Sequence, residues 1–227
     1  MVDTPPSPPA ALRLPMHRLR FHSCVAAVVA VLSTGSLVRA ETETATDLAK
    51  QARSECDAGR RATERTDREV HFKRGEAIAH QAVALDDTVA DGHFAVFCNM
   101  GELMRLDGET ISDLLALHTL LGELDRTLRL NPDHTDALAA KGTFLVRLPR
   151  LLGGNMIEGE KILRQVIAKD PNAFTSRLAL AKTCEARGDR DEAMSFATRA
   201  LEIARAQGRA DKISEAQATL DELRANR

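Results

Sequence analysis

The chain has 227 residues and a formal net charge of −2, and it contains neither Trp nor Tyr. Residues 41–227 alone hold 27 basic and 32 acidic side chains, a net charge of −5. This balance argues against a nucleic-acid-binding protein, which presents a clustered basic surface. The composition, rich in alanine, leucine and charged residues, is typical of packed helices.

The first 40 residues have the pattern of an N-terminal extension followed by a secretory signal peptide. A basic stretch at 16–20 precedes an apolar run at 24–32, and Val-Arg-Ala closes the segment at 38–40. We expect cleavage after Ala40, with Met1 or Met16 as the start of translation. The apolar run is far shorter than the ~20 residues of a membrane span, so we predict a periplasmic or secreted protein without a span after cleavage.

Helical periodicity and turn residues then divide the chain into helices. A first pair is predicted at 44–61 and 66–85, the latter burying a stripe of Phe72, Ala77, Ala79, Ala82 and Leu85. A second pair is predicted at 91–106 and 111–130, broken by Asp-Gly at 107–108.

The third pair begins near Thr135, and Pro149 ends its first helix. Its second helix is predicted at 156–168. Between the two, Leu151 and Leu152 need cover, and the glycines at 153–154 allow unusual backbone angles.

The fourth pair lies in the segment DPNAFTSRLALAKTCEARGDRDEAMSFATRALEIA at 170–204. Gly188-Asp189 ends one helix and starts the next. The tail after Gly208 places Ile213, Ala216, Leu220 and Leu223 on one face of a last helix.

The segment 170–204 resembles a tetratricopeptide (TPR) unit, a helical hairpin that repeats about every 34 residues. With Phe174 as the first position, Leu180 and Ala181 match the Leu-Gly pair of the pattern, and Ala193 and Ala200 match its small positions. Arg177, Cys184 and Ala197 depart from it, because aromatic residues are usual there. The resemblance implies an all-α, TPR-like solenoid of about four helix-turn-helix repeats plus a C-terminal capping helix. The predicted repeats are 44–89, 90–134, 135–173 and 174–207, and the cap is 208–227.

A second resemblance concerns Leu-Leu-Gly-Gly-Asn at 151–155. This segment looks like a feature of the T-component family of TRAP transporters. That family implies an extracytoplasmic helical protein that partners a substrate-binding protein and holds a small apolar ligand. Its members are typically lipoproteins, and the residues before Cys24 do not form a lipobox.

Three cysteines follow the predicted cleavage site: Cys56, Cys98 and Cys184. We expect all three to be buried small residues of the first helices of repeats. The alternative for two of them is a Cys56–Cys98 disulfide, which an oxidising compartment allows.

No enzymatic motif, metal site or cofactor is predicted. The sequence contains no GxSxG, P-loop or HExxH, and the spacing of His71, His80 and His93 matches no common ligand pattern. We interpret these histidines as residues on helix surfaces.

The TPR resemblance instead implies a partner-binding groove lined by the first helices of the repeats. The candidate groove residues are Phe94, Cys98, Glu102, Ala139, Thr143, Arg147, Leu178, Lys182 and Glu185. Arg147 and Lys182 together can hold a carboxylate, unless both are solvated or paired with acids such as Glu185.

The leading hypothesis is therefore a periplasmic, non-enzymatic scaffold that binds a protein or peptide in this groove. The alternative is a T-component-like accessory protein with an apolar ligand pocket.

Overall fold

Antiparallel helical hairpins make up the protein. A computed structural model describes residues 43–108 and 114–225, which belong to one compact unit, Glu41–Arg227. The predicted signal peptide and the start of the helix predicted from Ile111 lie outside the described residues. Within them the chain forms α-helices, one short 3-10 helix and no strand.

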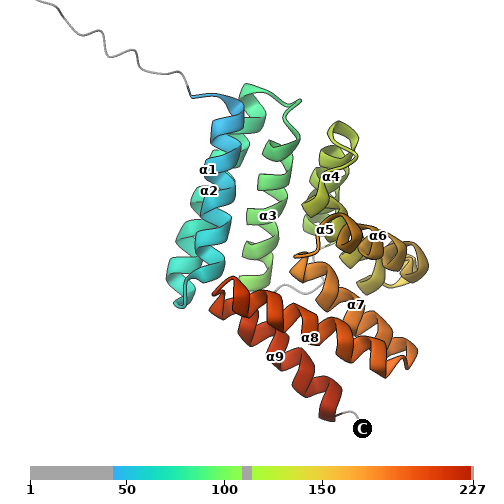
Figure 1. Ribbon diagram of the computed structural model, residues 1–227. Coiled ribbons are helices and arrows are strands. Elements are labelled where there is room, and N and C mark those ends of the chain that lie inside the picture. Colours follow the sequence, from blue (N-terminus) through green and yellow to red (C-terminus); the bar gives the residue numbers. More distant parts are fainter. Residues whose placement is uncertain (1–42, 109–113, 226–227) are drawn as a thin grey trace, which may run out of the picture. The chain divides into compact units, whose positions relative to one another are not determined.

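The helices follow one another in the predicted order (Figure 1). The elements are α1 (Ala45–Arg61), α2 (Arg65–Leu85), α3 (Ala90–Leu106), α4 (Leu114–Leu130), α5 (Thr135–Arg147), the 3-10 helix η1 (Arg150–Leu152), α6 (Met156–Lys169), α7 (Phe174–Arg187), α8 (Arg190–Ala206) and α9 (Ala210–Ala225).

Local signals set several of these boundaries. Thr44 and Asp47 form a capping box at the start of α1. Asn155 caps α6 by accepting a hydrogen bond from the backbone N–H of Glu158 at 3.1 Å. Gly188 ends α7 in the left-handed conformation, with φ 83°, so the predicted Gly-Asp turn between α7 and α8 is confirmed.

Each helix packs on the next, and alternate helices also meet. α1 contacts both α2 and α3, as Figure 1 shows for these three neighbouring helices. α5 contacts α7, and α7 contacts α9. Phe97 of α3 also meets Phe144 of α5, with ring centroids 6.0 Å apart. The helices α1, α3, α5, α7 and α9 therefore form one layer, and this layer carries the cavities described below. α9 also contacts α1, so the last helix reaches the first.

The core is a series of clusters between neighbouring helices. The largest joins α7, α8 and α9, where Ala193, Ala197 and Ala200 are fully buried beside Leu220 and Leu223. The small side chains let α7 and α8 approach closely, which is the reason for alanine at these positions. The buried face predicted for the last helix is present at Ala216, Leu220 and Leu223, and Ile213 is partly buried.

Two details of the predicted packing are wrong. Ala77 is exposed, and Leu85, predicted to be buried, is 58% exposed, because Gly75 takes part in the buried face of α2. Leu151, expected to be covered, is 98% exposed. The loop bends at Gly153, where φ is 87°, and the N–H of Asn155 donates to the Leu145 carbonyl. This turn fixes the loop against α5 and leaves Leu151 pointing away from it.

Candidate functional site

A basic cavity with a volume of about 260 Å³ is lined by α3, α5, α7 and α9, together with Arg60 of α1 and Arg68 of α2. Its described lining includes seven basic and three acidic residues. The basic residues are Arg60, Arg68, Arg105, Arg147, Lys182, Arg209 and Lys212, and the acidic residues are Glu102, Asp211 and Glu215. We call this space the basic cavity. Its charge is opposite to the net charge of residues 41–227.

An apolar cavity of about 340 Å³ adjoins it between α3, α4 and α5. Its apolar wall consists of Phe97, Cys98, Met104, Leu117, Leu120, Phe144 and Leu148. Arg60, Glu102, Arg105, Thr143 and Arg147 line both cavities, so the two are continuous. A third space of about 330 Å³ extends along α1 and includes Arg53, Phe94 and Ala139. We call the three spaces together the groove.

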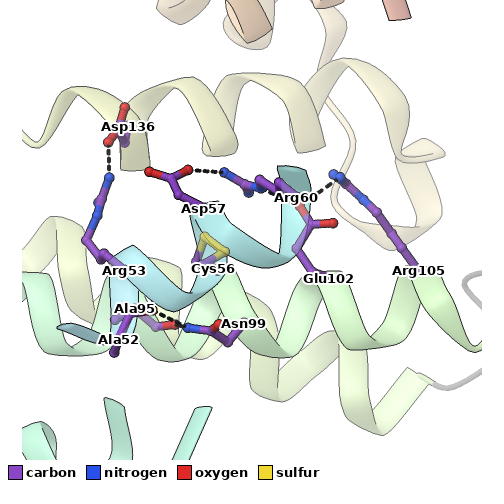
Figure 2. Close-up of a disulfide and its surroundings, with 11 residues drawn as sticks. Ala52, Arg53, Cys56, Asp57, Arg60, Ala95, Asn99, Glu102, Arg105 and Asp136 are labelled. Carbon is purple, nitrogen blue, oxygen red and sulfur yellow. Dashed lines mark hydrogen bonds and ion pairs between the residues drawn. A yellow bond between two sulfur atoms is a disulfide. The ribbon is translucent and has the colours of Figure 1, made fainter. Parts of the chain in front are cut away.

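Glu102 is buried in the wall that the basic and apolar cavities share. Its side chain is 5% exposed, and its Oε1 accepts hydrogen bonds from Arg60 Nε at 2.8 Å and Arg105 Nη1 at 3.2 Å. Removing a carboxylate from water is costly unless it is paired. The two arginines supply that pairing, and Asp57 lies 3.9 Å from Arg60 Nη1, so the charges of these four side chains balance (Figure 2).

Arg147 and Lys182 differ from these arginines in having no acidic partner in the described part of the chain. Both side chains are exposed and line the basic cavity, Arg147 from α5 and Lys182 from α7. Among residues 43–108 and 114–225, no carboxylate lies within ion-pair distance of either one. Their charges therefore remain free for a ligand that enters the cavity.

Two further cations come from α9 and the turn before it. Arg209 donates to both carboxylate oxygens of Asp211, at 2.9 and 2.7 Å, and these bonds raise the pKa of the Arg209 guanidinium. Burial and the neighbouring Arg209 lower the pKa of Lys212, whose ammonium lies 5.3 Å from the centre of the Phe174 ring. An anionic ligand beside Lys212 would favour its charged form.

A disulfide joins Cys56 of α1 to Cys98 of α3, and Cys98 is part of the wall of the apolar cavity (Figure 2). The expectation that all three cysteines are free buried residues is wrong for this pair, because the α1–α3 contact brings their Cα atoms within 6.4 Å. It holds for Cys184, which is free and buried. Burial in the first place, and then a hydrogen bond to Glu192, raises the pKa of the Cys184 thiol to about 12.

The structure brings most of the predicted groove residues to these cavities. Glu102, Thr143, Arg147, Leu178 and Lys182 line the basic cavity, although Leu178 is 4% exposed and presents little surface. Cys98 lines the apolar cavity, and Phe94 and Ala139 line the third space. Glu185 lines none of these three spaces in the described part of the chain.

Five basic residues of the basic cavity were missed from the sequence: Arg60, Arg68, Arg105, Arg209 and Lys212. Arg60 and Arg68 belong to the first hairpin, and the predicted groove residues begin only in the second. Arg209 and Lys212 belong to the last segment, for which the sequence predicts only a capping helix. The contact between α9 and α1 places them in the cavity, and no local sequence signal reports that contact.

Of the three histidines predicted on helix surfaces, His80 is exposed as predicted, whereas His71 and His93 link helices. His71 Nδ1 lies 2.6 Å from Glu55, and His93 is buried between Glu123, at 2.7 Å, and the Asp87 carbonyl, at 2.9 Å. The placement of His93 on a helix surface is therefore wrong. No group of three or more possible ligands that could hold a metal ion occurs among the described residues.

Comparison with known proteins gives likenesses in structure only. No family model and no curated protein matches the chain. A thermophilic TPR protein from Thermus thermophilus superposes with a TM-score of 0.54 at 21% identity, over 78% of this chain and 82% of that chain. The fold is that of an all-α TPR solenoid.

Two other solved structures are less similar. MamA has a TM-score of 0.45 at 17% identity, over 75% of this chain and 84% of its own. YrrB, described as a TPR protein with an unusual peptide-binding site, has a TM-score of 0.36 at 16% identity, over 78% and 93%. Among the described helices of the solenoid, none is long and apolar enough to cross a membrane.

Proposed function

We propose that this protein is a non-enzymatic scaffold that binds an acidic segment of a partner protein in its groove. The observation that carries the proposal is the presence of Arg147 and Lys182, which have no carboxylate partner among the described residues, in a cavity rich in cations. Arg holds a carboxylate through two parallel hydrogen bonds and Lys acts as a point charge. A side-chain carboxylate or a C-terminal carboxylate supplies the matching group.

The apolar cavity supports a more specific ligand. Because it shares Arg60, Thr143 and Arg147 with the basic cavity, a segment whose carboxylate contacts Arg147 can place a neighbouring side chain against the apolar wall that includes Phe97 and Phe144. A large apolar side chain fits this surface and excludes water from it. The proposed ligand is therefore an extended segment in which acidic and apolar residues are neighbours.

The proposed location is the periplasm or another oxidising compartment. Two observations support it: the signal-like pattern of residues 16–40 and the Cys56–Cys98 disulfide, a bond that is rare in reducing compartments. N-terminal sequencing of the protein recovered from the host envelope tests this proposal. A chain that begins at Glu41 supports export, and an intact Met1 or Met16 contradicts it.

A second candidate is a transport accessory protein that holds a small apolar ligand and partners a substrate-binding protein. The size and apolar wall of the apolar cavity favour it. Native mass spectrometry of the gently purified protein separates the two proposals. A retained lipid-sized molecule favours the accessory protein, and its absence with intact peptide binding favours the scaffold.

Peptide titration tests the scaffold. The probe is a fluorescein-labelled hexapeptide of alternating Glu and Leu with a free C-terminus, read by fluorescence anisotropy. The control peptide replaces Glu by Gln and is amidated. We expect binding of the acidic peptide only, weakened as salt rises because exposed charges are screened. Equal binding of both peptides, or no binding of either, contradicts the proposal.

A further inference from the structure

We propose that the Cys56–Cys98 disulfide positions the groove wall, so that ligand binding depends on its oxidised state. The inference rests on the proposed function. It starts from the seam between α1 and α3, where polar and covalent links occur at successive turns (Figure 2). A regular seam of this kind fixes how far α1 can slide or rotate against α3.

Three links to α3 follow one another along α1, at Ala52, Cys56 and Arg60. Asn99 Nδ2 donates to the carbonyls of Ala52, at 3.1 Å, and Ala95, at 2.9 Å. The disulfide follows, and one turn further along both helices Arg60 meets Glu102 at 2.8 Å. Because residues four apart lie on the same face of a helix, the disulfide sits directly beneath the Arg60–Glu102 pair.

That ion pair belongs to the binding surface. Arg60 lines all three spaces of the groove, and Glu102 lines two. Arg60 is 40% exposed on its side chain, and exposed pairs contribute little by themselves. The position of Arg60 relative to Arg147 and Lys182 therefore depends on what fixes α1 against α3, and the disulfide is the covalent link between those helices.

Reduction would change the apolar cavity directly. In the reaction a dithiol reductant donates two hydrogens, the sulfur–sulfur bond breaks, each cysteine becomes a thiol, and the reductant becomes a cyclic disulfide. Two unbonded sulfurs need more space than a bonded pair. Cys56 is fully buried against Phe72, whereas Cys98 lines the apolar cavity. The Cys98 thiol therefore moves toward the space that the ligand occupies.

Thermodynamic linkage makes the dependence reciprocal. If reduction lowers the affinity for the ligand by some factor, the ligand disfavours reduction by the same factor. A segment held in the groove also covers the open side of Cys98. The inference thus predicts both weaker binding by the reduced protein and a smaller reduced fraction of the occupied protein at equilibrium with a given reductant.

The affinity test compares three proteins with the Glu-Leu hexapeptide at a temperature where circular dichroism shows all of them helical. The variant Cys56→Ala/Cys98→Ala is expected to bind roughly fivefold or more weakly than the oxidised wild type. The variant Leu48→Ala, which removes a core side chain of α1 that lines no part of the groove, is expected to retain wild-type affinity. Equal affinity of the disulfide-free variant and the wild type overturns the inference.

The variant Arg60→Ala tests whether the disulfide acts through the position of Arg60. In Arg60→Ala the peptide binds more weakly, and reduction with dithiothreitol should cause little further loss, because the positioned group is already absent. A disulfide that acts only on overall stability would lower the affinity equally in both backgrounds, and that result contradicts positioning.

If the disulfide-free variant loses its helices, the wild type still carries the test. The protein is equilibrated with fixed ratios of reduced to oxidised dithiothreitol, and its reduced fraction is trapped with iodoacetamide and counted by mass, with and without saturating hexapeptide. Cys184 does not compete, since its buried thiol has a raised pKa. We expect the peptide to lower the reduced fraction, but not in Arg147→Ala/Lys182→Ala. An unchanged reduced fraction in the wild type overturns the inference, whereas failure of the wild type to bind the peptide refutes the proposed function itself.

Discussion

Arg53 of α1 reaches Asp136 of α5, 83 residues later in the chain, with its Nη2 atom 2.6 Å from Asp136 Oδ2. The same guanidinium lies 4.6 Å from the centre of the Phe94 ring. Arg53 thereby links the first hairpin to the third. The two parts of this contact differ in strength, and two substitutions separate them.

Asp136→Asn should cost less than about 1 kcal/mol, because the pair is partly exposed. Arg53→Ala should cost about 1–2 kcal/mol, since it also removes the interaction with Phe94. Urea unfolding followed by circular dichroism measures both. An Asp136→Asn loss as large as that of Arg53→Ala would show that the ring contact contributes nothing.

Two helical glycines should respond to alanine in opposite directions. A Cβ atom at Gly75 would collide with the buried side chain of Asn99, which ties α3 to α1, so Gly75→Ala should destabilise the fold by about 1–3 kcal/mol. Gly122 in α4 is exposed and has open space around it, so Gly122→Ala should stabilise by about 0.5–1 kcal/mol. Thermal unfolding of the two variants decides this, and a stabilised Gly75→Ala would refute the close contact.

Ala193→Trp should disrupt the C-terminal hairpin. Ala193 is fully buried between α7 and α8, and overpacking costs ~1–3 kcal/mol or more. Because repeats are stabilised by their neighbours, the loss should extend to α9. Ala206→Trp, at the exposed end of α8, is the matched control and should melt like the wild type. Identical melting curves for both variants would show that the helix register is wrong.

Acid should weaken the contact between α6, α7 and α8. Burial raises the pKa of Glu160, but hydrogen bonds from Arg164 and Arg187 outweigh it, and the pKa lies below its usual 4.5. Hydrogen bonds from Arg164 and Cys184 also lower the pKa of Glu192. Stabilisation by such carboxylates is complete above the unfolded-state pKa and is lost as the pH falls through the lower native pKa.

The stability of Glu160→Gln should therefore depend less on pH than that of the wild type below about pH 5. Urea unfolding at a series of pH values measures this. Glu64→Gln, which removes an exposed carboxylate without an ion pair in the described structure, is the control. A wild-type acid response in Glu160→Gln would show that this cluster is not the titrating site.

The helical hairpins could be predicted because their signals are local. Capping residues such as Thr44, turn glycines such as Gly188 and the small residues of α8 determine helix ends and close helix packing within a single hairpin. The prediction that Leu85 lies on the buried face of α2 is wrong. Periodicity counts apolar side chains, so it does not show that Gly75, against which α3 packs, belongs to the buried face.

The groove was only partly predictable, for a different physical reason. Arg147 and Lys182 follow from the register of their own repeats, and both line the basic cavity. Arg209 and Lys212 are in the cavity because α9 returns to α1, and Cys56 pairs with Cys98 because α1 lies on α3. These are contacts between segments distant in the sequence, and they depend on how all the hairpins stack.

In the proposed function, the groove binds an acidic segment through Arg147 and Lys182. The most direct measurement is the affinity of Arg147→Ala/Lys182→Ala for the Glu-Leu hexapeptide, beside Lys73→Ala/Arg199→Ala as a control with the same change in charge outside the groove. We predict that both variants keep the wild-type helicity, that the first loses most of its affinity, and that the control binds like the wild type. Undiminished binding by Arg147→Ala/Lys182→Ala, or an equal loss in the control, would contradict the claim.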